Sequence, residues 1–361
     1  MGLTSGAFLA VLIVLCVAAT LATALLGNRI PGPRPPAAVL ARIAMVAVCQ
    51  LLAVAVVAAW INNAFGLYTS WSDLLGTSSG KAVFTGPGGG AAAGPPGPAP
   101  TFTRQADGVL LTRARGPQSG LSGRILVWTP PEYDQPAYRT TGFPVVMLLH
   151  GIPGSPQTWF TAGEMPQAVE GLLTQRRVRP FLLVAPVIDP GRVNTDCSDV
   201  GATRTATWLA RDVPAIVGRS FRTLSGARGR ALLGLSTGGF CAVKLPLQFP
   251  SVFATGAAMS PDPLDGDPAA LPSAALRSAN SPQQLVRRSH PPVALLLATT
   301  LQDRTSRPAD LARFRQGARP PTRVSTLVLD TGGHNFGTWK RMYRTVLPWL
   351  SSHLAHGPGT P

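Results

Sequence analysis

The chain of 361 residues carries little charge, and lysine supplies little of it. Charged residues make up 13% of the chain, and only Lys81, Lys244 and Lys340 among its 32 basic residues are lysines. The other basic residues are arginines scattered through Ala-, Pro- and Gly-rich segments, without a compact basic stripe interleaved with aromatics. The sequence therefore predicts no nucleic-acid partner despite its formal charge of +16. This charge favours attraction to anionic lipid or wall polymer.

Histidine is also scarce, with five in the chain, and no two of them have the spacing of a metal-ligand pair. The sequence therefore predicts no zinc or iron site and no cofactor. His290 lies in a proline-rich loop, while His353 and His356 belong to the C-terminal helix and tail, where we expect them to be solvated. His150 and His334 remain as candidates for a functional role.

Two apolar runs occupy the N-terminal part of the chain. Residues 7–26 contain no charge, and residues 37–61 are interrupted only by Arg42 and Gln50, so each run is long enough to cross a bilayer as a helix. A cleaved signal peptide is the alternative for the first run, but no lysine or arginine precedes it and a second run follows. We expect a retained two-span anchor. Apart from Arg42, the runs lack the ionisable residues that transport pathways need, so transport is not expected.

The positive charges around the spans predict their orientation. Arg29, Arg34 and Arg42 cluster at the connection between them, which the positive-inside rule places in the cytoplasm. Both chain ends then lie outside, and we expect a multi-pass protein of the cell membrane with an extracellular C-terminal domain. The aromatic residues after the second span fit an interfacial belt or a short amphipathic helix packed on the main domain; they are Trp60, Phe65, Tyr68 and Trp71.

The remaining chain divides by composition. Residues 62–85 form a juxtamembrane segment, and residues 86–100 are a run of Gly, Pro and Ala that predicts a low-complexity linker. Residues 101–361 would form the catalytic domain. From residue 123 onward, short apolar runs alternate with longer amphipathic ones, which predicts an α/β fold with a mainly parallel central sheet covered by helices on both faces.

The expected elements are as follows. Strands are predicted over 124–128, 145–149, 181–187, 231–234, 253–259, 293–298 and 324–329, and helices over 163–176, 205–219, 237–248, 308–316 and 338–354. Pro246 falls inside the helix 237–248, which should end early or kink there. Catalytic groups are expected just after each strand, because ligands gather at the carboxyl ends of parallel strands.

Ser236 is the candidate nucleophile. It lies between Gly234 and Gly238, after a short apolar strand and before a helix, and this G-x-S-x-G pattern is typical of a nucleophile elbow. The turn is sharp, and side chains at the two glycine positions would collide with the neighbouring strand and helix. The sequence therefore predicts a serine hydroxyl presented at the edge of the sheet.

Backbone amides from two places are candidates for an oxyanion hole. The strand 145–149 is followed by the turn His150 to Gly154, in which Ile152 has an amide to donate and Pro153 has none. The amide of Thr237, at the start of the nucleophile helix, would be the second donor. The alternative interpretation of the turn is a plain connection between strand and loop.

His334 and Asp303 complete a predicted catalytic triad. His334 follows the last strand on a glycine-rich loop, so its ring could meet Ser236 as general base. Asp303 follows the preceding strand and gives the chain order Ser, Asp, His of this fold. Asp310 is the alternative acid, whereas Asp330 is too close to His334 along the same loop to reach its ring correctly.

Four cysteines complete the inventory. Cys16 and Cys49 lie in the predicted spans and are interpreted as small apolar residues. Cys197 and Cys241 belong to the exported part, where an oxidising compartment would allow them to form a disulfide that pins a polar loop beside the active site. Two separate buried thiols are the alternative.

Over residues 120–354 the chain resembles the putative-esterase group of α/β-hydrolases, which includes S-formylglutathione hydrolases, feruloyl esterases and actinobacterial mycolyltransferases. The resemblance lies in His150 to Gly154 with Trp159, in Thr207, Trp208, Leu209, Asp212, Val213 and Pro214, in Gly234 to Gly239 with Phe249 and Pro250, and in Gly333, His334 and Trp339. It implies an α/β-hydrolase fold and a cofactor-free serine hydrolase or acyltransferase with an acyl-enzyme intermediate.

The departures from this pattern favour an esterase. The mycolyltransferases carry an aspartate where His150 stands and use a glutamate as the third triad member, and neither residue matches here. We therefore expect a membrane-anchored extracellular serine esterase acting on an ester of lipid or cell-envelope origin. An acyltransferase of the mycolyltransferase type is one alternative. A non-catalytic envelope protein with an occluded or misaligned Ser236 is the other.

Overall fold

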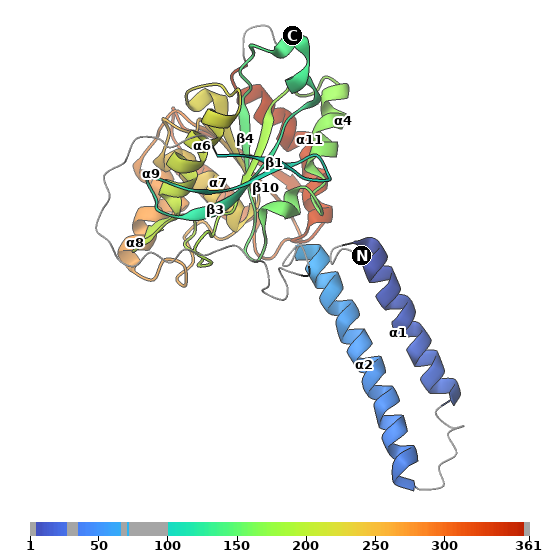
Figure 1. Cartoon of the computed structure of the whole chain (residues 1–361). Coiled ribbons are helices and arrows are strands. Elements are labelled where there is room, and N and C mark those ends of the chain that lie inside the picture. Colours follow the sequence, from blue (N-terminus) through green and yellow to red (C-terminus); the bar gives the residue numbers. More distant parts are fainter. Residues whose placement is uncertain (1–4, 27–34, 66–70, 72–99, 357–361) are drawn as a thin grey trace. The chain divides into compact units, whose positions relative to one another are not determined.

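The computed structural model describes residues 5–26, 35–65, 71 and 100–356, and the chain divides into two units, residues 1–86 and 87–361 (Figure 1). The first unit contains the apolar helices α1 (Gly6–Leu26) and α2 (Pro35–Phe65). Both are long and apolar enough to cross a membrane, so the two predicted spans are present as helices. Arg29, Arg34, Tyr68 and nearly all of the predicted linker lie outside the described residues.

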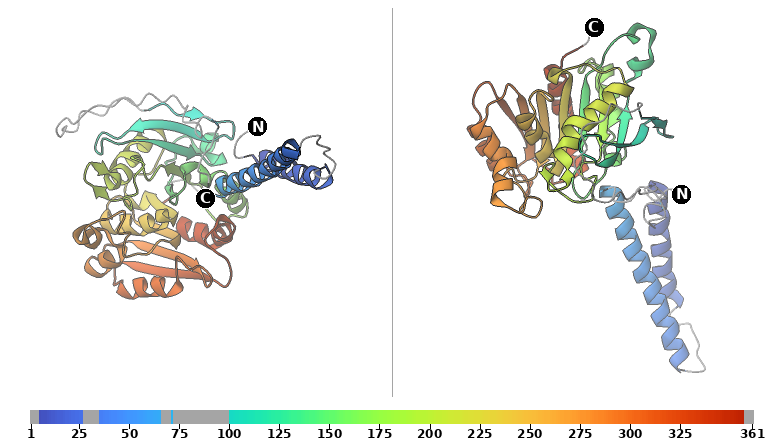
Figure 2. Two further views of the ribbon diagram at one scale, coloured as in Figure 1. Left: turned by 90° about the horizontal axis from the view of Figure 1, so that it is seen from below. Right: turned by 60° about the vertical axis from the view of Figure 1, so that its left-hand side comes forward.

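The second unit is built on a nine-stranded sheet with the order β1-β2-β3-β5-β4-β8-β9-β10-β11. The six strands from β5 to β11 in this order run parallel, and β1, β2 and β3 are antiparallel additions at one edge. The bounds are β1 Thr103–Arg104, β2 Leu110–Arg115, β3 Ser122–Trp128, β4 Val145–Leu149, β5 Leu182–Pro186, β8 Arg230–Ser236, β9 Thr255–Pro261, β10 Ala294–Thr300 and β11 Arg323–Leu329. In Figure 2 the two edges are separated by colour, teal at one and orange at the other.

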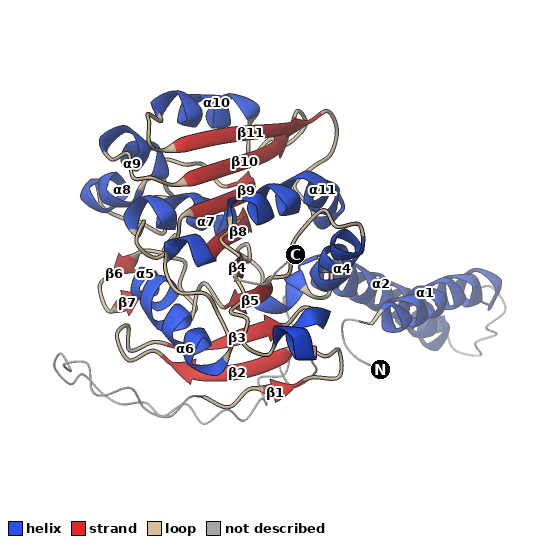
Figure 3. Cartoon of the chain, turned by 90° about the horizontal axis from the view of Figure 1, so that it is seen from above, coloured by secondary structure: helices blue, strands red, loops and turns tan. Residues whose placement is uncertain are grey.

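Helices cover both faces of this sheet, as the sequence predicts (Figure 3). Their bounds are α4 Met165–Thr174, α5 Thr205–Thr207, α6 Val213–Ser220, α7 Thr237–Gln248, α8 Ala274–Asn280, α9 Pro282–Arg288, α10 Pro308–Gly317 and α11 Phe336–His353. One core layer contains residues of α6, α7, α9 and α10, and the other contains residues of α4 and α11. Successive side chains of strand β4 point to opposite faces of the sheet: Met147 belongs to the first core layer, and Val146 and Leu148 belong to the second.

Several local features differ from the sequence prediction. Strands β1 and β2 and helices α8 and α9 were not predicted, and β9 ends at Pro261, two residues later than expected. The helix expected over 205–219 contains a π-helical segment, Trp208–Asp212, just before Pro214. The buried Asp212 carboxylate accepts the amides of Gln118 and Ser119 and so ties this helix to the turn after β2.

Pro246 does not end α7 early, since the helix continues to Gln248. Proline lacks the amide that would bond to the carbonyl of Ala242 one turn earlier. Instead, this carbonyl oxygen faces Gly256 of β9 so closely that a Cβ atom there would overlap it. The proline thus lies in the last turn of the helix, where the freed carbonyl packs against the sheet.

Candidate active site

Ser236 occupies a strained turn between β8 and α7. Its backbone angles are φ 54° and ψ −124°, in the left-handed half of the map that non-glycine residues rarely adopt. A Cβ atom at Gly234 would overlap the carbonyl of Gly238, and a Cβ atom at Gly238 would overlap the carbonyl of Leu149. Glycine is therefore required two residues before and two residues after the serine, which explains the two glycines of the G-x-S-x-G pattern.

The structure brings Ser236, His334 and Asp303 together in one hydrogen-bonded chain. The Nε2 atom of His334 lies 2.9 Å from the Oγ atom of Ser236, and its Nδ1 atom lies 3.1 Å from Oδ2 of Asp303. The Asp303 side chain is fully buried, whereas that of His334 is 26% exposed. Solvent can thus reach the imidazole from one side while the carboxylate holds it from the other.

The carboxylate of Asp303 is held by its own loop. Its Oδ1 atom accepts the amides of Thr305 and Ser306, both at 3.0 Å, which leaves Oδ2 for the ring of His334. Burial alone would raise the pKa of Asp303, but the Ser306 amide and the facing His334 ring outweigh it, so the pKa lies below its ordinary value. Asp303 is therefore ionised at neutral pH, and its Oδ2 atom can accept a hydrogen bond from the imidazole ring.

The loops after β10 and β11 are hydrogen-bonded to each other, which holds Asp303 next to His334. The hydroxyl of Thr300, at the end of β10, donates to the carbonyl of Gly332 in the loop after β11. The amide of Gly332 donates to the side chain of Gln302 at 3.0 Å, and the amide of Asp303 donates to the Thr300 hydroxyl at 3.0 Å. The alternative acid, Asp310, pairs with Arg307 and lies on α10.

Trp339 adds a contact to which the sequence analysis assigned no role. Its buried ring packs edge to face against the ring of His334, with centroids 5.2 Å apart and an interplanar angle of 82°. Trp339 lies one turn into α11, whose first turn is capped by Asn335 through a 3.1 Å bond from the Thr338 amide. The helix start and the tryptophan together limit the rotation of the imidazole.

The turn after β4 lies directly against the serine. A Cβ atom at Gly151 would come within 3.1 Å of the Cβ atom of Ser236, so this turn closes one side of the site. Within residues 100–356, the amides of Ile152 and Thr237, the two predicted oxyanion donors, make no backbone hydrogen bond outside the helices and strands. Thr237 is buried and Ile152 is half-buried.

His150 is a buried structural residue of this turn. Its Nε2 atom accepts the Ile188 amide at 3.1 Å, so Nδ1 carries the proton and donates it to the Gly151 carbonyl at 2.8 Å. Burial lowers the pKa of His150 to about 4, and the ring is neutral at neutral pH. Asp189, 3.8 Å from Nε2, is partly buried, which raises its pKa to about 6. His150 thus fixes the turn and has no free nitrogen for a substrate.

Asp262 is a site residue that the sequence analysis missed. Its Oδ1 atom accepts the Ser236 hydroxyl at 3.0 Å and its Oδ2 atom accepts the Thr237 hydroxyl at 2.6 Å. Its amide donates to the Ser236 carbonyl at 3.2 Å. The signal was its place directly after β9, which the prediction ended two residues too soon.

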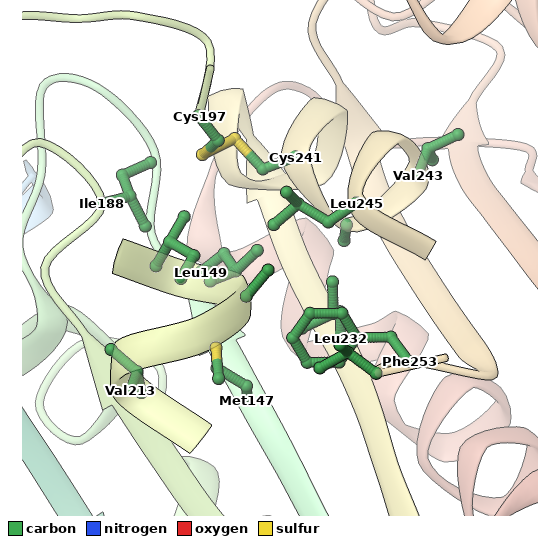
Figure 4. Packing of buried hydrophobic residues seen from close by; sticks show 14 of the residues in the cluster. Met147, Leu149, Ile188, Cys197, Val213, Leu232, Cys241, Val243, Leu245 and Phe253 are labelled. Carbon is green, nitrogen blue, oxygen red and sulfur yellow. A yellow bond between two sulfur atoms is a disulfide. The ribbon is translucent and has the colours of Figure 1, made fainter. Parts of the chain in front are cut away.

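Cys197 and Cys241 form a disulfide that ties the loop after β5 to the first turns of α7 (Figure 4). Next to it, the fully buried Lys244 donates from Nζ to the Asp196 carbonyl and to the Ser198 hydroxyl, both at 2.6 Å. Burial lowers the pKa of Lys244 to about 7, although the charges of Asp196 and Asp199 oppose this. The loop is thus held to the nucleophile helix by a covalent bond and by a buried amine.

The chain belongs to the family described as Putative esterase, whose model matches residues 121–340. The family match supports a hydrolase of the esterase type. An uncharacterized protein of Corynebacterium glutamicum is 30% identical over 138 residues, which are 37% of this chain and 32% of that protein. The chain thus matches about a third of the length of this curated relative.

Solved esterase structures share the fold of the second unit. A ferulic acid esterase superposes with a TM-score of 0.58 at 19% identity and covers 68% of this chain and 98% of its own. The S-formylglutathione hydrolase of Agrobacterium tumefaciens gives 0.57 at 18% identity, over 71% and 99% of the two chains. A fluorophosphonate-binding serine hydrolase of Staphylococcus aureus gives 0.55 at 15% identity, over 71% and 99%. The predicted α/β-hydrolase fold is thereby confirmed.

Proposed function

We propose that this protein is a membrane-anchored extracellular serine esterase that works through an acyl-enzyme intermediate. The observation that carries the proposal is the continuous chain from the Ser236 hydroxyl through the His334 ring to the Asp303 carboxylate, with contacts of 2.9 and 3.1 Å. Hydrogen-bond contact between nucleophile and base, with the base oriented by a third group, is the signature of an activated serine.

In acylation, Ser236 Oγ attacks the ester carbonyl carbon while its proton passes to Nε2 of His334. The buried charge of Asp303 holds the Nδ1–H tautomer and stabilises the imidazolium that results. The same proton then goes to the leaving alcohol as the carbon–oxygen bond of the ester breaks. In deacylation, water attacks the acyl carbon and gives a proton to His334. The bond between that carbon and Ser236 Oγ then breaks, Oγ takes the proton back from His334, and the carboxylic acid leaves.

The negative charge that develops on the carbonyl oxygen needs donors on the β4 side of the serine. We assign this role to the amides of Ile152 and Thr237. The contact between Gly151 and Ser236 and the fixed ring of His150 support the assignment, because they hold the β4 turn rigidly beside the nucleophile. Preorganised donors of this kind contribute about 10²–10³ to the turnover rate each.

The substrate is proposed to be a carboxylic ester of lipid or cell-envelope origin. The apolar helices α1 and α2 would hold the enzyme at the membrane, with the charged connection in the cytoplasm and the catalytic domain outside. His150 is buried and has used both nitrogens, so sugar binding at that position is disfavoured. This supports esterase chemistry over the mycolyltransferase alternative, and the half-buried, aligned Ser236 disfavours a silent domain.

Fluorophosphonate labelling of the full chain in detergent tests the reaction. The native chain should become labelled and Ser236→Ala should not, while both retain the same far-ultraviolet circular dichroism. Asp310→Asn is the matched control and should label normally, since Asp310 makes surface pairs only. Absence of labelling in folded native protein would refute the proposed chemistry.

A membrane-impermeant fluorophosphonate tests the orientation separately. Added to intact cells that produce the chain, it should label the native protein as fully as it does after lysis. Labelling that appears only after lysis would place the domain in the cytoplasm and would refute the extracellular part of the proposal, without affecting the esterase part.

A further inference from the structure

Asp262 gives the Ser236 hydroxyl a second acceptor. The hydroxyl has one proton, and both Nε2 of His334 and Oδ1 of Asp262 lie within 3.0 Å of its oxygen. Only transfer to His334 activates the serine in the proposed reaction. A carboxylate at this place therefore does not help acylation, because it competes with the base for the same proton.

The Asp262 carboxylate has a fixed position beside Ser236. The Thr237 hydroxyl holds Oδ2 at 2.6 Å, and the Asp262 amide bonds to the Ser236 carbonyl, so the side chain cannot move far from the serine. Over residues 100–356, no lysine or arginine nitrogen lies within 4.0 Å of this carboxylate. Its Oδ1 atom thus depends on the serine proton for its hydrogen bond.

Acylation removes that proton. In the acyl-enzyme, Ser236 Oγ is an ester oxygen with lone pairs only, and it would face the lone pairs of Oδ1, which lies 3.0 Å from Oγ in the resting enzyme. A half-buried acceptor that has lost its donor is costly until another donor arrives. The acyl-enzyme therefore contains two adjacent empty acceptors, Nε2 of His334 and Oδ1 of Asp262.

We propose that these two atoms together bind the nucleophile of deacylation, and that Asp262 selects a nucleophile with two donors. This inference rests on the proposed esterase function. One hydroxyl must give its proton to His334 as its oxygen attacks the acyl carbon and the bond to Ser236 Oγ breaks, with the proton returning to Oγ. A second O–H must donate to Asp262. Water has two such protons, and so has a vicinal diol such as a glycerol or sugar unit, whereas a monohydric alcohol has one.

The test compares two alcohols on the native full chain in detergent with p-nitrophenyl acetate as acyl donor. Ethane-1,2-diol and 2-methoxyethanol place a second oxygen at the same position, but only the diol has a proton on it. The partition between transferred ester and acetate, measured by gas chromatography, should favour the diol about tenfold, as expected for one hydrogen bond to a charged acceptor.

Asp262→Asn tests the residue itself. The amide can still accept the Thr237 hydroxyl through its oxygen, but it then presents N–H instead of an acceptor to the nucleophile. The diol preference should fall to within about twofold of unity, and deacylation should slow more than the initial burst of p-nitrophenol. Asp265→Asn is the matched control, because Asp265 lies in the same loop and pairs on the surface with Arg313. It should keep the native preference.

Three results would overturn the inference: equal partition of the two alcohols on the native chain, an unchanged diol preference in Asp262→Asn, or the same loss in Asp265→Asn. The comparison of alcohols on the native chain needs no substitution, so it remains decisive if Asp262→Asn does not fold. A native chain without a Ser236-dependent burst would refute the proposed function, whereas a normal burst with equal partition would refute only the role of Asp262.

Discussion

Replacing Asp303 by asparagine should trap His334 in the wrong tautomer. The Oδ1 position accepts the amides of Thr305 and Ser306 at 3.0 Å, so the asparagine oxygen must stay there and its NH₂ group must face Nδ1 of His334. Nδ1 then accepts a hydrogen bond, the ring proton moves to Nε2, and Nε2 can no longer accept the proton of Ser236. The geometry is kept while the base is lost.

A loss of about 10⁴ in the acylation rate is expected, the size found when this tautomer is lost in a serine protease. The burst of p-nitrophenol from p-nitrophenyl acetate, recorded by stopped flow on the full chain in detergent, measures this step directly. Asp310→Asn controls for removal of a carboxylate from the same region and should stay within twofold of the native rate. An Asp303→Asn burst within tenfold of the native rate would show that the contact between Asp303 and His334 does not orient the base.

Three further outcomes follow from packing, cross-linking and charge. Gly238→Ala should leave little folded, labelling-competent enzyme, because its Cβ would overlap the Leu149 carbonyl; a native melting temperature would contradict this. Cys241→Ser should lower the free energy of unfolding by about 3–4 kcal/mol in denaturant titrations, because the disulfide closes a loop between cysteines 44 residues apart. As a control, dithiothreitol should lower the free energy of unfolding of the native chain by the same amount. Below pH 6.5 the unfolded chain protonates His150, whereas the folded chain does so only near pH 4, so acidification lowers the free energy of unfolding by about 3 kcal/mol through this group. Asp189, whose pKa is raised to about 6, gains its proton first in the folded state and offsets much of this loss. The melting temperature of Asp189→Asn should therefore fall further between pH 8 and pH 4.5 than that of the native chain, because the variant lacks this offset, and an equal fall in both chains would refute the coupling.

Much of this fold could be predicted from the sequence because its strands are short apolar runs of a parallel sheet. The strand 145–149 has the predicted bounds, and α7 runs from Thr237 to Gln248 as expected. Strand β2 was missed because it is half-exposed, next to the two-residue edge strand β1, and has arginines at positions 113 and 115, so no apolar run marks it. Helices α8 and α9 were missed because each is only seven residues long and they are separated by Ser281 alone.

The candidate site was predictable where a residue follows an apolar strand and has a chemically distinctive side chain. Ser236, Asp303 and His334 all meet both conditions. Asp262 meets them too, but β9 continues through Ser260, which has φ 45°, and Pro261, two residues that do not read as strand. The tie between Thr300 and Gly332 is a contact across 32 residues between side chain and backbone, and no local pattern encodes it.

Strand order determines how an ester can lie in the proposed reaction. Ser236 ends β8, with β4 on one side and β9, β10 and β11 on the other. The β4 side offers the turn with Ile152, whose amide is a donor, while the β9 to β11 side offers Asp262 and His334 as acceptors. A carbonyl oxygen gaining negative charge is stabilised only toward the donors, so the leaving alcohol must point toward the acceptors. The alcohol side of the substrate, and any alcohol that replaces it, should therefore lie on the β9 side of Ser236, next to Asp262.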